Sequence, residues 1–301
     1  MKEIISHKET VGTISVITAT IITGLNVYLA KIASFINWLL LASITLTLAG
    51  LILTLINFFF GKVSEILKSG KKYFLKLLWI GAVGTTVPMG MTFYGLRLSP
   101  ISNTFLLQTE VLYSMILSYI LLGERISRRQ FFLSLLAFLG VFLITSEGTL
   151  RWMSLGDLLF LLAPFFFQCA HVVAKNLMQI ISPLTVVMYR HLIGGLASLL
   201  IFMLFGSNHL EDALNIPLRG IIIILCISLS YVTGNSLWYY GIKNINLSKA
   251  TAIMITYPTI SVILAVITLG EKLSSIKFIG IIIVFFSILE LSLSKTSKRK
   301  P

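Results

Sequence analysis

Long apolar runs, separated by very short polar segments, occupy almost the whole chain. A helix that spans a membrane needs about 20 mostly apolar residues, and we identify ten such runs. They cover residues 11–30, 36–60, 73–96, 99–121, 129–147, 155–177, 183–205, 218–241, 246–268 and 275–294. Because lipid offers no partners for exposed peptide groups, each run is predicted to be helical. The expected fold class is an all-α polytopic membrane protein with ten transmembrane helices.

Composition agrees with this class. Apolar residues make up 56% of the 301 residues and charged residues only 12%, about half the charged share of an average soluble domain. The formal charge of +13 could indicate a nucleic-acid partner. The basic residues, however, lie in short loops between apolar runs and form no single patch. We therefore expect no nucleic acid, and a lipid bilayer as the surroundings of the chain.

The distribution of Lys and Arg predicts the orientation. If the N-terminus is inside, most of the 24 basic residues fall on inner segments, as the positive-inside rule requires. The loop at residues 62–72 is the most basic of these segments. Glu211 and Asp212 then fall outside. We predict a multi-pass protein of the plasma (inner) membrane with both termini in the cytoplasm.

An internal repeat divides the chain. The sequence Leu-Gly-Glu-Arg-Ile-Ser at residues 122–127 recurs as Leu-Gly-Glu-Lys-Leu-Ser at residues 269–274. At nearly the same spacing, Tyr-Gly-Leu-Arg at 94–97 is matched by Tyr-Gly-Ile-Lys at 240–243, and Lys31 by Lys175. Matches in the same order at a nearly constant spacing indicate two related halves.

The halves are predicted to be inverted. We place the first five-helix repeat at residues 1–148 and the second, with a short basic tail, at residues 149–301. Because five is an odd number, the second half enters the membrane upside down relative to the first. Inverted repeats that meet near the midplane are the usual scaffold of alternating-access carriers.

At these residues the chain resembles the EamA-type members of the drug/metabolite transporter superfamily. The doubled motif at 122–127 and 269–274 ends the fourth helix of each half in that family. Residues 256–259 match its mid-helix proline, whereas the first half keeps an acid, Glu110, but has Val111 in place of the proline. The resemblance implies a central cavity lined mainly by helices 1, 3, 4, 6, 8 and 9. It also implies transport of small organic solutes, commonly the export of amino acids or other metabolites.

Polar residues inside the runs form stripes at helical spacing. One face of the sixth helix carries Gln168, His171 and Lys175, and the fourth helix carries Asn103, Glu110 and Ser114. Polar faces inside a membrane should point to protein or to a water-filled cavity. The candidate substrate-binding or cavity residues are Asn26, Tyr28, Tyr94, Gln108, Glu110, Gln168, His171, Asn235, Trp238 and Tyr257. Ordinary hydrogen bonds between helices, or aromatic anchors at the interface, are the alternative roles.

Glu110 is the candidate coupling residue. It lies about eleven residues into the fourth run, with no Lys or Arg one turn away on its own helix. Desolvation favours the neutral form of an acid at this depth, so a proton could be exchanged during transport. A protonated Glu110 that only bonds a neighbouring helix is the alternative.

Other charged residues are given structural roles. Lys31, Lys175, Arg190 and the adjacent His191 are expected to reach the membrane interface. Glu124 and Glu271 follow a glycine at a helix end. They are expected to cap that helix or to pair with nearby Arg and Lys such as Arg128 or Lys272.

The sequence contains none of the motifs we would expect of an enzyme, so no catalytic residue, metal or cofactor is predicted. The first hypothesis is a secondary-active exporter of small organic metabolites such as amino acids, working by alternating access and coupled to protons. A transporter of cationic amines or other metabolites, and a non-transporting scaffold or sensor with the same fold, remain as alternatives. A small-molecule substrate is the expected partner, and a homodimer stays open.

Overall fold

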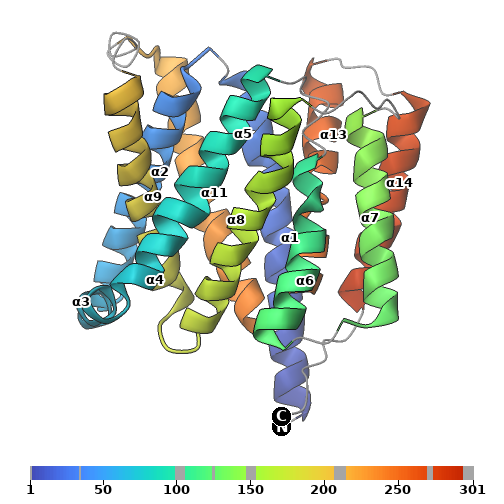
Figure 1. The fold of residues 1–301 in the computed structure, drawn as a ribbon, viewed down its shortest axis with the longest axis horizontal. Helices are drawn as coiled ribbons and strands as arrows, with labels where there is room; N and C mark the ends of the chain where they lie inside the picture. The colour runs from blue at the N-terminus through green and yellow to red at the C-terminus, as the bar shows by residue number, and fades with distance from the viewer. Residues whose placement is uncertain are drawn as a thin grey trace.

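The computed structural model describes residues 2–33, 35–98, 106–123, 126–146, 154–206, 215–269 and 274–293, and every regular element in these ranges is a helix (Figure 1). The helices are α1 (Lys2–Ile32), α2 (Trp38–Phe59), α3 (Val63–Lys72), α4 (Phe74–Leu78), the π-helix η1 (Trp79–Thr86), α5 (Val87–Leu98), α6 (Glu110–Leu122), α7 (Arg128–Ser146), α8 (Leu155–Leu177), α9 (Pro183–Phe205), α11 (Leu218–Asn244), α12 (Leu247–Met254), α13 (Tyr257–Leu269) and α14 (Ser275–Leu293). Each of the predicted apolar runs coincides with helical residues, so the all-α class is confirmed over these ranges.

The surface of the molecule suits a bilayer. Seven helices of the described ranges are long and apolar enough to cross a membrane. Many large apolar side chains point outward, among them Phe59 at 84% and Phe205 at 82% exposed. Soluble monomers rarely expose such extensive apolar surface, whereas lipid tails accept it without cost. The chain is therefore a multi-pass membrane protein.

Two of the predicted runs are interrupted near their middle. The run at 246–268 is divided between α12, which ends at Met254, and α13, which begins at Tyr257. Pro258 follows, and a proline has no N–H to continue the helical ladder. In the first half, a 3₁₀ turn at residues 106–109 precedes α6. Glu110 therefore lies in the first turn of a helix, and not inside a continuous one as the sequence suggested.

The run at 73–96 contains a π-helical segment that the sequence did not predict. Within η1, the Thr85 hydroxyl donates to the carbonyl of Ile80 at 3.1 Å. Glycines bring this segment close to two neighbours, because a Cβ on Gly84 would lie 2.0 Å from Ala170 of α8 and one on Gly81 2.6 Å from Ile193 of α9. Such close approach of helices at small residues is typical of membrane proteins.

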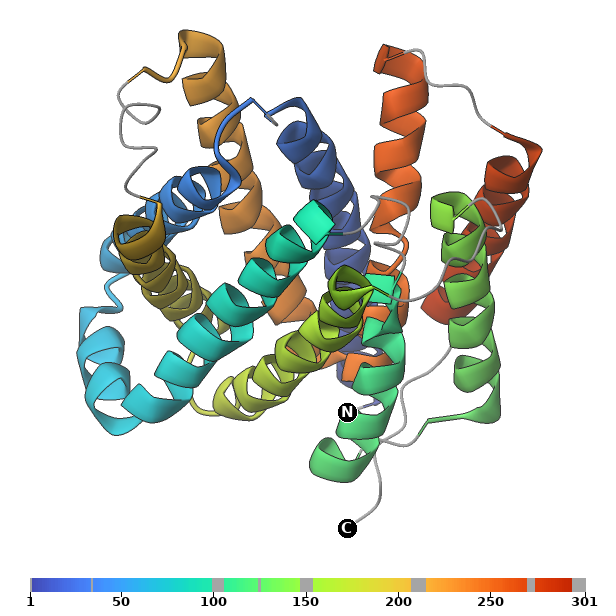
Figure 2. The ribbon, with the colours of Figure 1, turned by 45° about the horizontal axis from the view of Figure 1, so that its top comes forward.

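Helices of the two halves pack in pairs. The most extensive contacts are those of α2 with α9, α1 with α11, α5 with α8, and α7 with α14 (Figure 2). α2 and α9 approach closely, because a Cβ on Gly50 would lie 2.6 Å from the backbone of Leu192 and one on Gly195 2.5 Å from that of Thr47. The inner surfaces of α8, α9 and α11 face one another in this arrangement, and they carry the polar residues described next.

Candidate functional site

A chain of buried polar side chains connects α6, α8, α9 and α11. On α8, Gln168 Nε2 donates to Glu110 Oε1 at 2.5 Å. One turn further along the same face, His171 Nδ1 lies 3.4 Å from Arg190 Nη1 of α9. Arg190 Nη1 also donates to the hydroxyl of Tyr239 on α11 at 2.6 Å. Gln168, His171 and Arg190 are each at most 5% exposed.

A capping box defines the beginning of α8. Ser154 and Asp157 form a capping box, in which the Ser154 hydroxyl accepts from the Asp157 backbone and the Asp157 carboxylate from that of Ser154. Capping of this kind satisfies backbone donors that the first turn leaves free. Residues three apart on a helix share a face, so Gln168 and His171 both point toward the interior.

The hydrogen bonds assign the tautomer of His171. Its Nδ1 atom lies 3.4 Å from the indole Nε1 of Trp238 as well as from Arg190 Nη1. Both of these nitrogens are donors only, so Nδ1 must be the acceptor. The ring is then neutral, with its proton on Nε2. The Trp238 ring lies against the imidazole with a centroid distance of 5.3 Å.

Arg190 is the centre of charge in the cluster. Its guanidinium interacts electrostatically with Glu110, His171, His191, Tyr231 and Tyr239, and it lies 5.4 Å from the centroid of the Tyr239 ring. The expectation that Arg190 and His191 reach the interface is wrong, because they are 5% and 1% exposed. The packing of α9 between its neighbours directs both side chains inward.

Three more of the predicted site residues lie near this cluster. Gln108 Nε2 donates to the Tyr257 hydroxyl at 3.4 Å, and this bond links α13 to the turn that precedes α6. Tyr257 also interacts electrostatically with Glu110. Asn26 of α1 interacts with the hydroxyl of Tyr231.

The remaining predicted residues make no hydrogen bond to a described residue of this cluster. Tyr28 shares a 2.8 Å hydrogen bond with Thr268, and Tyr94 is 49% exposed. Asn235 is half-buried, and its side chain makes no hydrogen bond to a described residue. Lys175, in the last turn of α8, donates from its amine to the backbone carbonyl of Ile245 at the end of α11. Asn103, Glu124 and Glu271 lie outside the described residues.

Sequence reasoning missed Arg190, His191, Tyr231 and Tyr239 as members of the cluster. For Arg190 a signal was available, because seven residues at 1.5 Å each place it about 10 Å into the run that begins at Pro183. For Tyr231 the spacing with Ser228, Asn235 and Trp238 indicated a shared face of one helix. That spacing could not show that this face, or Tyr239, meets Arg190 of another helix.

Several buried polar atoms of this region have no hydrogen-bond partner among the described residues. They are Ser114 Oγ, Gln168 Oε1, Arg190 Nε and both ring nitrogens of His191. A buried polar atom without a partner is unfavourable. The cluster therefore has donors and acceptors left with which to bind a small polar molecule. In the ranges that the structure covers, no three His, Cys, Asp or Glu side chains are grouped as metal ligands.

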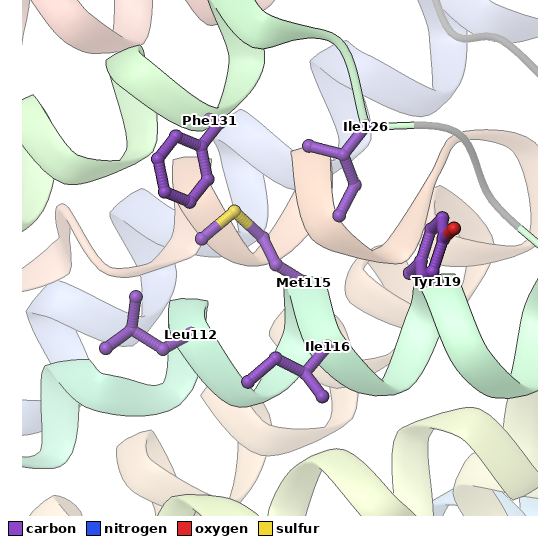
Figure 3. Close-up of a pocket in the computed structure, with 6 residues that line it drawn as sticks. All are labelled: Leu112, Met115, Ile116, Tyr119, Ile126 and Phe131. Carbon is purple, nitrogen blue, oxygen red and sulfur yellow. The ribbon is translucent and has the colours of Figure 1, made fainter.

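An apolar groove on α6 is distinct from this site (Figure 3). It has a volume of about 250 Å³ and is lined by Leu112, Met115, Ile116, Tyr119, Ile126 and Phe131. Ile116 and Tyr119 are more than half exposed. The groove carries none of the charged groups of the polar cluster, and its surface matches that of the lipid-facing helices.

Known proteins with similar sequences are transporters. The chain is 26% identical over 239 residues to the uncharacterized transporter YyaM of Bacillus subtilis, covering 77% of this chain and 76% of that one. It is 28% identical over 254 residues to the riboflavin transporter ImpX of Fusobacterium nucleatum, covering 80% and 84%. It is 25% identical over 191 residues to a probable amino-acid metabolite efflux pump of Salmonella typhimurium, covering 60% and 63%.

A solved crystal structure shares the fold. It superposes with a TM-score of 0.78 over 94% of this chain and 95% of the other, at 15% identity. The profile of the EamA-like transporter family matches residues 10–146 and again residues 154–293. These two matches cover nearly all of the chain, which therefore belongs to the EamA-like transporter family.

Proposed function

We propose that the chain is a secondary-active exporter of small organic metabolites such as amino acids, working by alternating access. The observation that carries this proposal is the polar cluster around Glu110 and Arg190, which is enclosed by helices α6, α8, α9 and α11. A scaffold or sensor has no need of buried opposite charges, whereas a carrier needs groups that hold a solute. The names of the riboflavin and amino-acid relatives support a small organic solute.

The mechanism we propose uses ten spans in two inverted repeats, residues 1–148 and 149–301. The pairing of helices supports it, because each of the closest pairs takes one helix from each half. The direction of the helices supports it too. α1 begins, and its counterpart α8 ends, toward the same end of the molecule (Figure 1). Exchange of conformations between two such halves would move access from one side to the other.

We further propose that Glu110 couples transport to protons. The groups that face it are Gln168, which donates to its carboxylate, Tyr257, and the charge of Arg190. Two of these neighbours, the Gln168 amide and the Tyr257 phenol, are uncharged, and Arg190 is not paired directly with the carboxyl. We therefore propose that the Glu110 carboxyl can take up or release a proton when its surroundings change during transport. The cluster thus supplies one group that can gain and lose a proton beside a fixed positive charge.

The test is Glu110→Gln in proteoliposomes. A ligand is first identified by thermal stabilisation of the purified protein with amino acids, cationic amines and riboflavin, because a ligand of the folded state raises the melting temperature. We expect the variant to bind this ligand but to lose the stimulation of transport by a pH gradient. The matched control is Glu290→Gln, which removes the partly exposed partner of Arg129 on α7 and should keep that stimulation. If Glu110→Gln transports at the same rate and with the same pH dependence as the wild type, Glu110 is not the coupling group.

A further inference from the structure

Arg190 is a buried cation without a direct counter-ion. It is 5% exposed, and over the described ranges its guanidinium has no carboxylate within 4 Å. A guanidinium is always charged in a protein. Removing such a charge from water is costly unless an anion and further hydrogen bonds compensate. Among the residues that the structure describes, the charge of Arg190 is therefore left without a directly paired anion.

Glu110 does not pair directly with Arg190. Glu110 feels the charge of Arg190, but its carboxylate is held by Gln168 at 2.5 Å. Gln168 and His171, one turn apart on α8, contact Glu110 and Arg190 respectively. The α8 side chains thus keep the two opposite charges separate.

The hydrogen bonds of Arg190 leave one edge of the guanidinium free. Both bonds of Arg190 use Nη1, and they go to two uncharged groups, the Tyr239 hydroxyl and the His171 ring. Nε is buried without a partner, and Nη2 makes no bond to a described residue. Nε and Nη2 form the side-on edge of the guanidinium, which can donate two parallel hydrogen bonds to the two oxygens of a carboxylate.

We propose, on the basis of the transport function proposed above, that Arg190 binds a carboxylate group of the transported solute through its Nε–Nη2 edge. Tyr239 and His171 are positioning residues, because they occupy Nη1 and fix the plane of the guanidinium. Trp238, whose indole lies 3.4 Å from His171 Nδ1, is beside the same site and contributes to the fluorescence of the four tryptophans.

The first test compares ligands on the unaltered protein. Thermal stabilisation and tryptophan fluorescence are measured with L-phenylalanine, L-leucine and 3-phenylpropionate, and with the methyl ester of each. We expect the free acids to bind at least tenfold more tightly than their esters, since a charge-assisted pair is lost in the ester. Equal binding of acid and ester, or no binding by any acid of the set, would overturn the proposal.

The second test substitutes Arg190, the proposed anchor of the solute carboxylate. Arg190→Gln should raise the Kd of the acids at least tenfold and leave that of the esters unchanged. Arg190→Lys keeps the positive charge but not the planar guanidinium. Its Kd for the acids should lie between that of Arg190→Gln and that of the wild type. Arg129→Gln is the control, because Arg129 is an exposed arginine paired with Glu290. If Arg190→Gln binds the acids as the wild type does, Arg190 is not the anchor.

Transport separates this inference from the function on which it rests. Uptake of riboflavin but of none of the acids into proteoliposomes would leave the carrier function standing and remove the anchor. Binding of the acids that depends on Arg190, without any transport, would retain the anchor and remove the carrier function.

Discussion

Glu65 of the short helix α3 forms a hydrogen bond to the beginning of α9. Its carboxylate accepts from the backbone N–H of Ser182 at 2.8 Å, and Ser182 is the N-cap of α9. Lys62 donates to the Ser182 hydroxyl from the same side, at 3.1 Å. Burial alone would raise the pKa of Glu65, but hydrogen bonds from Thr185 and Ser182 and the charge of Lys62 outweigh it and hold the pKa below 4.5.

This contact predicts a pH-dependent contribution to stability. A carboxyl whose pKa is lowered by folding stabilises the protein above its ordinary pKa of 4.5, and the contribution is lost as the pH falls through the lowered value. Glu65→Gln should therefore reduce the free energy of unfolding by about 1 kcal/mol at neutral pH. Thermal unfolding against pH should show the difference from wild type shrinking below pH 4.5. Lys68→Gln, exposed on the same helix, should have little effect. A Glu65→Gln deficit that is constant with pH would contradict this assignment.

Spacing along a single helix predicted part of the candidate site. The interval between Gln168 and His171 was sufficient to place them on one face of α8, and the structure brings Gln168 to Glu110. Spacing could not show that Arg190 and Tyr239 meet them. Their partners lie on other helices, and the rotation of α9 about its own axis depends on its packing against α2 at small residues such as Gly50 and Gly195.

At the scale of the helix, hydropathy predicted the elements well because lipid leaves the backbone no alternative to helix. It did not predict the π-helical segment η1, since one additional residue per turn does not change the hydropathy of an apolar run. The break between α12 and α13 was visible as Pro258, whereas the turn before α6 has no proline. The short helix α3 lies in the loop that the sequence identified only by its basic residues.

The close approach of η1 to α8 can be tested with two glycines of the same span. Gly84→Ala would place a Cβ 2.0 Å from Ala170, whereas Gly90 has no atom within 4 Å of the added Cβ. We expect Gly84→Ala to destabilise the protein by about 1–3 kcal/mol through overpacking. Gly90→Ala should be neutral or stabilising by roughly 0.5–1 kcal/mol. Thermal unfolding in detergent measures both. Equal stability of the two variants would mean that α8 moves away from Gly84 at no cost.

At the scale of the whole molecule, the repeated Leu-Gly-Glu motif carried the most information. In its first copy, Gly123 ends α6 with a φ of +62°, a conformation that glycine adopts without strain. The pairing of α2 with α9 and of α7 with α14 could not be predicted from the motif. It depends on how the two repeats pack against each other, which a linear pattern does not specify.

The orientation predicted from charge requires α3 and the N-terminus on one side of the membrane and the end of α9 on the other. α3 lies toward the same end of the molecule as the beginning of α1, and α9 ends toward the opposite end (Figure 1). A segment rich in Lys should remain in the cytoplasm, so residue 68 should be inside and residue 209 outside.

Cysteine labelling in intact cells decides this orientation. The free Cys169 and Cys226 are first replaced by serine, and a single cysteine is then introduced as His209→Cys or Lys68→Cys. A membrane-impermeant maleimide added outside should label the cysteine at 209 and not that at 68, and permeabilisation should make both reactive. The opposite pattern would reverse the orientation in the membrane but keep the two loops on opposite sides. Labelling of both from one side would contradict the proposed odd number of spans per half, and with it the inverted repeat that we propose for alternating access.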